Sequence, residues 1–237
     1  MITLSGIFSA PIKSFALIPH QEVYVGYKGL LGDRRFYLID SKGKLITQRN
    51  CTRLALIRCG FLESKNELSI ILPDGRIIRG EPALGRKIRT MLWGRRFNGH
   101  IVDGDWNDAI SEFCGFQVKL VKSEFEGNCY DEYPLSILSK DSAKSLESKE
   151  FQDIDIRRFR PSILIDGLNP FEENYWIGSS ISIGNDLVVQ IEGKDPRCSI
   201  VSNNPNDGFQ DGDMLAHLRH VTSDIYLGVY GLSLIHI

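Results

Sequence analysis

Residues 180–198 read SISIGNDLVVQIEGKDPRC, and this stretch is the clearest indication of the fold. Two short runs rich in β-branched residues, 180–184 and 187–193, are separated by turn residues. Runs of this length and composition between turn residues are typical of β-strands. The second run leads into a turn that places Arg197 and Cys198 side by side. The stretch therefore predicts two strands followed by a cationic side chain next to a thiol.

The same strand pattern recurs along the chain, at residues 34–40, 55–61, 67–72, 76–80, 116–121 and 161–167. The sequences SKGK (41–44) and PDGR (73–76) predict hairpin turns, because each has a glycine where a positive φ is expected. Helical patterns are confined to three short segments, 105–115, 139–148 and 212–220. Many short strands with few helices predict a mainly β (α+β) protein, with a barrel-like or sandwich-like architecture and a few peripheral short helices.

Composition is that of an ordinary globular protein. The 237 residues are 42% hydrophobic and 24% charged, which is enough to build a sizeable core. A net charge of −2 provides no electrostatic attraction for nucleic acid or an anionic membrane. No apolar run approaches the roughly 18 residues of a membrane span, and the N-terminus lacks a secretory signal pattern. We therefore expect no nucleic-acid partner and no membrane span.

The cysteines favour a reducing compartment. There are five, an odd number at irregular spacing, and none forms a CxxC pair. Neither a disulfide framework nor a zinc ribbon is indicated by this pattern. We therefore expect a cytoplasmic protein.

Three basic clusters stand out: PIKS at 11–14, GDRRF at 32–36 and RRFRPS at 157–162. A Lys or Arg near a Ser hydroxyl in a turn can bind a phosphate, which needs both positive charge and hydrogen-bond donors. Taken singly, each cluster is better explained as a solvated surface or as a set of salt-bridge partners.

Cys198 has two interpretations. Cysteine attacks electrophiles and binds metals as the thiolate, and a neighbouring cation such as Arg197 favours that form. A free cysteine at a strand end is otherwise most often a small apolar residue that packs in the protein. From this stretch alone, packing is the better supported of the two.

Longer motifs link these clusters in order. The first half contains IFSAPIKSF, GLLGDRRFYLID and TQRNCTRLALI, and the second half contains RRFRPSILIDGLNPFEENYW and DPRCSIVSNNP. With these motifs, residues 2–231 resemble the MOSC family, in a two-part arrangement similar to the mitochondrial amidoxime-reducing component and its bacterial relatives. The resemblance implies an N-terminal β-barrel-like domain and a MOSC domain. We place them at residues 1–122 and 123–237, because the composition changes near residues 122–132.

The resemblance also implies a molybdenum cofactor and residues that hold it. Cys198 of the xRC element matches the protein ligand of molybdenum and is the expected catalytic residue. The positions that match cofactor contacts are Lys13, Ser14, Arg34, Ser139 and Arg160. Ser162 stands where the family usually has Asn and can still donate a hydrogen bond, and Arg197 is expected to keep Cys198 deprotonated. Structural roles are expected for Arg35, Arg157, Arg158 and Asp166.

Two further departures concern the neighbourhood of the xRC element. Many family members read CxRC, and here Asp195 replaces the first cysteine. The sequence SNNPND follows where VDPxTG is common. The implied metal ligand is retained, whereas the environment of the metal is expected to differ.

The activity implied by the resemblance is that of a molybdenum-dependent oxidoreductase. It would reduce small N-hydroxylated substrates, such as hydroxylamines, amidoximes or N-hydroxylated bases. An external ferredoxin-like, haem or flavin donor would supply electrons, because the sequence shows no flavin, haem or iron–sulfur motif. Two alternatives stay open: a non-catalytic carrier of the cofactor or its sulfur, and a β-barrel binding module without a metal.

The last residues, GVYGLSLIHI, are expected to differ from the natural end of the domain. Family members continue past GVYG with a strand, a Gly-rich turn and a closing strand, and in some bacterial relatives an iron–sulfur domain follows. Residues 232–237 correspond to a translated library-preparation adaptor, so no chemical role is expected for His236. We also expect an unpaired sheet edge at residues 224–237, where the sequence is apolar and nearly uncharged.

Overall fold

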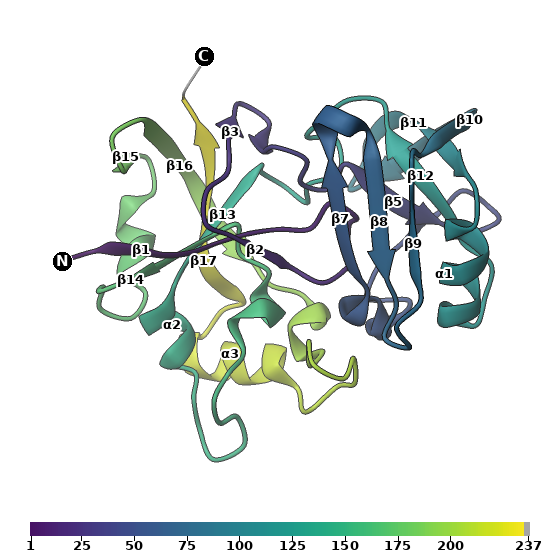
Figure 1. The fold of residues 1–237 in the computed structure, drawn as a ribbon. Coiled ribbons are helices and arrows are strands. Elements are labelled where there is room, and N and C mark those ends of the chain that lie inside the picture. The colour runs from purple at the N-terminus through teal and green to yellow at the C-terminus, as the bar shows by residue number, and fades with distance from the viewer. Residues whose placement is uncertain (235–237) are drawn as a thin grey trace.

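A computed structural model describes residues 1–234 of the chain, so His236 lies outside the described residues. Two groups of strands lie side by side in Figure 1, with α2 and α3 against one group and α1 against the other. We call the group with α1 the first lobe and the group with α2 and α3 the second lobe. In residues 1–234, no helix is long and apolar enough to cross a membrane.

The second lobe is a seven-stranded sheet. In spatial order its strands are β15 (Ser180–Ile183), β16 (Leu187–Pro196), β17 (Tyr226–Ser233), β13 (Leu135–Ser139), β14 (Ile163–Asp166), β1 (Thr3–Ser9) and β2 (Ile18–His20). The β13–β14 pair is parallel and the other pairs are antiparallel. The helices of this lobe are α2 (Lys140–Lys144) and α3 (Met214–Thr222).

The first lobe combines a five-stranded and a three-stranded sheet. The five-stranded sheet has the order β10 (Ala83–Leu92), β11 (Arg95–Asp103), β12 (Lys119–Ser123), β5 (Phe36–Ile39) and β6 (Leu45–Ile46). The three-stranded sheet contains β7 (Arg58–Leu62), β8 (Glu67–Ile71) and β9 (Ile77–Gly80), and α1 (Trp106–Cys114) packs against the lobe. A small hairpin, β3 (Val25–Gly26) with β4 (Gly29–Leu30), lies between β2 and β5 in sequence.

Short 3₁₀ turns complete the described structure. They are η1 (Thr52–Leu56), η2 (Glu63–Lys65), η3 (Ile156–Phe159), η4 (Glu172–Trp176) and η5 (Ser199–Ser202). Two of them flank the candidate site, because Arg160 directly follows η3 and η5 begins after Cys198.

The mainly β expectation is confirmed, with three α-helices among residues 1–234. The barrel-like part of the expectation needs a correction, because the sheets in this range are open and do not close into a barrel. Instead, both faces of the seven-stranded sheet are covered. In β14, Leu164 packs with α2 and α3, while Ile163 and Ile165 face the opposite side. Burial on both faces replaces closure as the way to protect the apolar strands.

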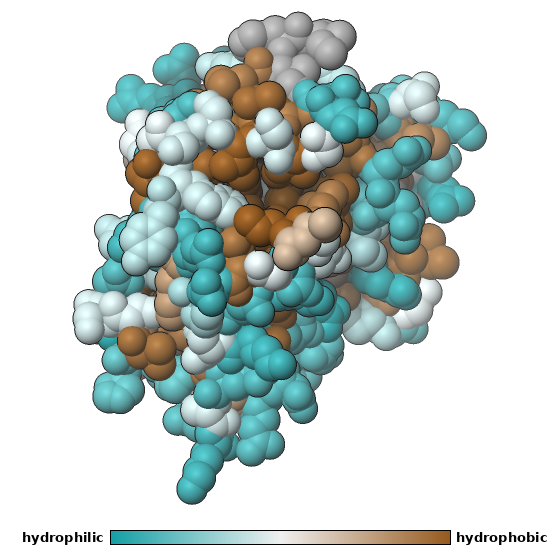
Figure 2. Space-filling view, turned by 90° about the vertical axis from the view of Figure 1, so that its left-hand side faces the viewer, coloured by the Kyte–Doolittle hydropathy of each residue, from teal (hydrophilic) through white to brown (hydrophobic). Residues whose placement is uncertain are grey.

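The side of the second lobe where β1, β14 and β15 lie has an apolar patch on part of its surface. Figure 2 shows brown, hydrophobic side chains gathered on this side of the molecule. Partly buried residues of β15 and β16 contribute to the cluster beneath it, among them Ile181, Ile183 and Leu187.

The hairpins and the first helix form as predicted. Gly43 and Gly75 have φ of 78° and 90° in the turns after β5 and β8, as their positions required. Helix α1 starts after Asp105 and ends at Gly115, whose φ of 78° is the left-handed conformation of a C-cap glycine. The side chain of Asp105 makes no capping hydrogen bond, so the helix start depends on packing of its apolar face.

The β10–β11 hairpin, residues 83–103, was not predicted. Both strands contain several charged residues, and most of β10 is exposed. A strand that packs little apolar surface gives a weak hydrophobic pattern. The pairing with β12 shows that sheet hydrogen bonds hold this hairpin in place.

The expected edge at residues 224–237 is wrong for the described part of that segment. Strand β17 lies inside the sheet, between β16 and β13, and its register runs to the pair Ser233–Val189. The edges are β15 and β2. The apolar composition of β17 therefore reflects burial in the sheet.

The N-terminal segment crosses between the lobes. Strands β1 and β2 add to the seven-stranded sheet, although they belong to the first half of the sequence. Between these two strands the chain contacts the first lobe, where Ile12 pairs with Phe36 of β5. The segment that carries Lys13 and Ser14 thus lies at the junction of the lobes. The division at residues 122 and 123 stays a prediction.

Candidate functional site

A cleft of about 590 Å³ lies between the lobes. Residues from distant parts of the chain line it, among them Arg34, Arg49, Trp93, Asp131, Arg160 and Cys198. Of the residues predicted from the sequence, Arg34, Arg160, Ser162, Arg197 and Cys198 line this cleft. The fold therefore brings the basic clusters GDRRF (32–36) and RRFRPS (157–162) together with the Cys198 thiol.

Arg34 and Arg160 reach the cleft from backbone positions of unusual conformation. Their φ values are 49° and 53°, in the left-handed region that non-glycine residues rarely adopt. Arg160 ends η3 in this conformation, directly before Pro161. Such strain persists only where the surroundings enforce it, and it is often found at functional sites.

Arg160 has an unused hydrogen-bond donor. Its Nη2 is buried and has no hydrogen-bond partner among the described residues. Burial and the nearby charge of Arg34 lower the pKa of Arg160 to about 10. Two neighbouring guanidinium groups, one with a free buried donor, favour an anion in the cleft.

Lys13 lies one layer behind the cleft wall. Its Nζ donates to the Cys129 carbonyl at 2.9 Å and to Asp131 Oδ2 at 3.0 Å. Burial lowers the pKa of Lys13, while the Asp131 carboxylate opposes that shift. Lys13 therefore acts on the cleft through Asp131, which does line it.

Ser14 and Ser139 are not among the residues that line the cleft. The Ser14 hydroxyl accepts a hydrogen bond from the Gln48 N–H at 3.3 Å, and its carbonyl accepts one from Gln48 Nε2 at 2.7 Å. The fully buried Ser139 caps α2, accepting from the Asp141 N–H at 3.2 Å. Both side chains hold backbone segments in place in this structure.

Arg197 is fixed in the interior of the second lobe. Its Nε donates to the Leu227 carbonyl at 2.8 Å and its Nη1 to the Phe159 carbonyl at 2.6 Å. Its Nη2 lies 2.8 Å from Asp195 Oδ2, and both side chains are almost fully buried. The guanidinium therefore connects three segments around the cleft.

Asp195, which replaces the first cysteine of the CxRC motif, is the ion-pair partner of Arg197. Besides the ion pair with Arg197, it accepts a hydrogen bond from Ser136 Oγ at 2.6 Å. Burial raises the pKa of Asp195, and the Arg197 charge counteracts this. An acidic residue at this position thus neutralises the buried arginine.

The cation that contacts the thiol is Arg49. Its Nη2 lies 3.2 Å from Cys198 Sγ, and its guanidinium stacks on the Trp93 ring at 4.9 Å from the ring centroid. Trp93 in turn donates from Nε1 to Asp131 Oδ1 at 3.2 Å. This chain of contacts joins the β10–β11 turn to the thiol. The TQR element that contains Arg49 was part of the resemblance, but nothing in its local pattern pointed to Cys198.

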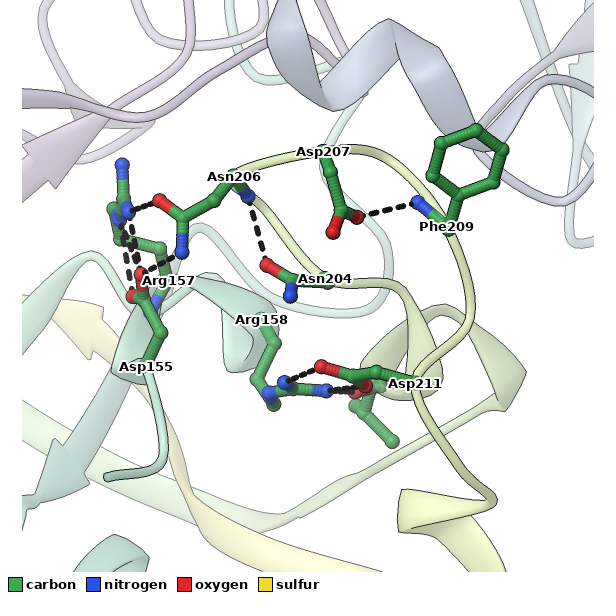
Figure 3. Close-up of polar contacts among 9 residues, drawn as sticks. Asp155, Arg157, Arg158, Asn204, Asn206, Asp207, Phe209 and Asp211 are labelled. Atoms are coloured by element: carbon green, nitrogen blue, oxygen red, sulfur yellow. Dashed lines mark hydrogen bonds and ion pairs between the residues drawn. The ribbon is translucent and has the colours of Figure 1, made fainter. Parts of the chain in front are cut away.

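The segment after Cys198 is anchored by Arg157 and Arg158, as Figure 3 shows. Arg158 donates to both carboxylate oxygens of Asp211, at 3.0 and 2.8 Å. Arg157 pairs with Asp155 and contacts Asn206. These two arginines hold the loop that follows η5 against η3, and Arg158 also lines the cleft.

The interactions of Asp131 with Lys13 and Arg34 predict that the stability of the folded protein depends on pH. Partial burial would raise the pKa of Asp131, but the charges of Lys13 and Arg34 outweigh burial and lower it. A carboxyl whose folded pKa lies below the unfolded value of about 3.9 stabilises the protein above that pH. This contribution is lost as the pH falls through the folded pKa. We therefore expect Asp131→Asn to be destabilising at pH 7 and progressively less so below about pH 4.

Urea unfolding of the wild type and the Asp131→Asn variant at pH 7, 5 and 3 measures this effect. The difference in unfolding free energy should be the same at pH 7 and 5 and smaller at pH 3. A difference that stays constant over the whole range would show that the Asp131 charge contributes nothing. Asp153→Asn, at an exposed position, is a control expected to show little change at any pH.

Two protein-family models match the chain. The MOSC N-terminal beta barrel domain matches residues 1–115, and the MOSC domain matches residues 124–234. The two matched ranges correspond to the two halves of the chain that meet at the cleft. Residues 116–123 lie between the two matched ranges.

Several proteins are similar in sequence or structure. A molybdenum cofactor sulfurase from Drosophila melanogaster is 26% identical over 86% of this chain and 28% of its own length. The mitochondrial amidoxime-reducing component 1 from Xenopus laevis is 25% identical over 86% of this chain and 66% of its own. The crystal structure of the YUAD protein from Bacillus subtilis is 14% identical, covers 99% of this chain and 88% of its own, and has a TM-score of 0.49. The chain spans less than a third of the length of the sulfurase.

Proposed function

The chain belongs to the MOSC family, and on that basis we propose that its cleft binds a molybdenum cofactor. The observation that carries the proposal is the buried, unpartnered Nη2 of Arg160 in a cleft shared with Arg34 and Cys198. A pterin cofactor has a phosphate that needs such cations and a metal that needs a soft donor. The residues present fit both requirements.

The phosphate end would be held by Arg34 and Arg160. Both are charged at neutral pH, and both line the cleft. Arg160 Nη2 is buried without a partner, and in such a low-dielectric setting a charge-assisted hydrogen bond is strong. Asp33 and Asp131 balance part of this charge, which keeps two guanidinium groups compatible before an anion arrives. Lys13 supports Asp131 from behind.

The metal end would be held by Cys198. A thiolate is a suitable ligand for a soft centre, and Arg49 Nη2 donates to the Cys198 sulfur at 3.2 Å. The hydroxyl of Tyr230 stays protonated, because burial and the Asp195 charge raise its pKa. It therefore donates to Asp195, whose charge is balanced by Arg197.

The reaction proposed for this site is the two-electron reduction of small N-hydroxylated compounds. When bound, a molybdenum cofactor supplies two-electron redox chemistry with oxygen transfer. The substrate class follows from the similarity to the amidoxime-reducing component, and an external ferredoxin-like, haem or flavin donor would provide the electrons. Cytoplasmic location stays a prediction.

The similarity to molybdenum cofactor sulfurases supports a second candidate function, a carrier of the cofactor or its sulfur. Protein purified from a molybdenum-competent host separates the possibilities. About one molybdenum and one pterin per chain, together with reduction of benzamidoxime by a chemical electron donor, would support the reductase. A loaded protein without turnover would support the carrier. Protein without metal or pterin would support a binding module of another kind.

The phosphate interaction predicts the effect of a single charge removal. Arg160→Ala should weaken cofactor retention by about 1.5–3 kcal/mol, the usual contribution of a hydrogen bond to a charged group. This corresponds to roughly 10- to 150-fold in the dissociation constant. Pterin content after dialysis of loaded protein measures it. Arg79→Ala, at an exposed arginine of β9, is the charge-matched control, and equal loss in both variants would exclude Arg160 as a phosphate ligand.

A further inference from the structure

The tip of the β10–β11 hairpin contributes Trp93 and Arg95 to the lining of the cleft. Leu92 pairs with Arg95, so Trp93 and Gly94 are the two residues of the turn. Their φ values are 50° and 79°, in the left-handed region that such a turn requires and that Asn-Gly usually occupies. Tryptophan in this conformation is an outlier, and strain of this kind persists where other contacts enforce it.

Two contacts hold the Trp93 side chain, although the residue is 62% exposed. Its Nε1 donates to Asp131 Oδ1 at 3.2 Å, and the Arg49 guanidinium lies 4.9 Å from the ring centroid. Stacking on an aromatic ring orients a guanidinium and leaves its N–H groups available for further hydrogen bonds. The hairpin tip therefore holds Arg49 in place at the cleft.

The two arginines at this position have unused donors. Of the five N–H groups of Arg49, one contacts the Cys198 sulfur at 3.2 Å. Arg95 donates from Nη2 to the carbonyls of Tyr130 and Asp131, at 2.5 and 2.6 Å. Within residues 1–234, neither Arg49 nor Arg95 forms an ion pair with a carboxylate, so both positive charges are available to a ligand.

The charge of the cleft lining favours an anion as that ligand. In the described part of the chain, six arginines and three acidic residues line the cleft. Asp131 is already paired with Lys13. Asp195 is already paired with Arg197. The third acidic residue, Glu132, is exposed. An excess of positive charge in a cleft attracts anionic ligands.

We propose that Arg49, Trp93 and Arg95 form a subsite that binds the carboxylate of a small planar substrate. We call it the hairpin-tip subsite. The proposal rests on the proposed reductase function and specifies its substrate class, N-hydroxylated compounds that carry a carboxylate. Arg49 offers a planar fork of N–H groups, and Arg95 adds a second positive charge. The exposed part of the Trp93 ring packs against the flat body of the substrate.

Binding measured without turnover tests the hairpin-tip subsite. The full chain, purified from a molybdenum-competent host, is titrated calorimetrically at pH 7 with benzamidoxime and with 3- and 4-carboxybenzamidoxime. At least one carboxylated compound should bind about tenfold more tightly than benzamidoxime, the gain expected from a hydrogen bond between charged groups. Arg49→Gln should reduce this preference to a ratio of about one. Arg49→Lys should give an intermediate ratio, because an ammonium group keeps the charge without the planar fork.

Three further variants show where the carboxylate binds. Arg79→Gln, at an exposed arginine of β9, should keep the full preference. Arg160→Ala should keep it too, since the phosphate end of the cleft is a separate anion site in the proposed function. Trp93→Leu should weaken the binding of charged and neutral compounds alike, and Trp93→Phe should restore part of it through ring stacking. Circular dichroism verifies that each variant is folded.

Four outcomes would overturn the subsite. They are no binding of any of the compounds, no carboxylated compound that binds more tightly than benzamidoxime, a preference that survives in Arg49→Gln, and a preference that is lost in Arg160→Ala.

Turnover with a chemical electron donor separates this proposal from the reductase itself. Reduction of all compounds with equal kcat/KM and equal affinity would support the reductase and remove the subsite. A carboxylate preference that depends on Arg49, without reduction of any compound, would support the subsite and remove the reductase.

Discussion

Replacing Cys198 by alanine is expected to lower the molybdenum content of the purified protein at least tenfold while leaving it folded. Cys198 is the proposed protein ligand of the metal, and its sulfur contacts only the exposed Arg49 side chain among the hydrogen bonds described. Removing a contact that orients a metal ligand lowers metal affinity about 10- to 100-fold. Removing the ligand itself should lower metal affinity further. The side chain is half-buried at a turn, so the free energy of unfolding should change by less than about 1 kcal/mol.

Metal analysis and pterin content of protein from the same host measure the effect, and circular dichroism checks the fold. Cys114→Ser is the matched control, because that cysteine is equally half-buried and lies outside the cleft lining. It should retain the metal. Equal molybdenum in the wild type and Cys198→Ala would remove Cys198 from the proposed site, and Arg160 would then have to be tested as an anion site alone.

The second large effect concerns stability. Arg197→Met should lower the free energy of unfolding by about 3–5 kcal/mol, the usual cost of removing one partner of a buried ion pair. Methionine keeps much of the volume but leaves Asp195 buried without its charge partner. It also leaves the Leu227 and Phe159 carbonyls without their guanidinium donor.

Urea denaturation measures this difference. Arg89→Met on the exposed surface of β10 is the control and should change stability by less than about 0.5 kcal/mol. In the double variant Asp195→Asn/Arg197→Met the uncompensated charge is gone, so part of the loss should be recovered. A single Arg197→Met variant as stable as the control would mean that water enters and solvates Asp195.

Local sequence patterns predicted much of the secondary structure. The strands around residues 34–40, 67–72 and 187–193 and the two glycine hairpins are encoded by neighbours in sequence, because strand composition and turn conformation are local properties. The β10–β11 hairpin was not predicted, because its stability depends on a contact that is distant in sequence. Its charged strands are stabilised by pairing with β12, a contact that no local pattern reveals.

The candidate site was predictable in part. Arg34, Arg160 and Cys198 were identified through family motifs, and the fold brings them to one cleft. Arg49, Trp93 and Asp131 were missed, because each gains its role from residues on another segment. Trp93 in particular lies at an exposed turn, where only the packing of the lobes gives its ring two polar neighbours.

The sequence by itself determined a mainly β chain of the MOSC family, with a thiol and several arginines at set points. The tertiary structure decided which arginine serves which purpose. Arg197 directly precedes Cys198 in sequence, but its guanidinium is held inside the second lobe, because it pairs with Asp195 and donates to the Leu227 and Phe159 carbonyls. Arg49, about 150 residues away, reaches the sulfur instead, because electrostatic contact depends on distance through space.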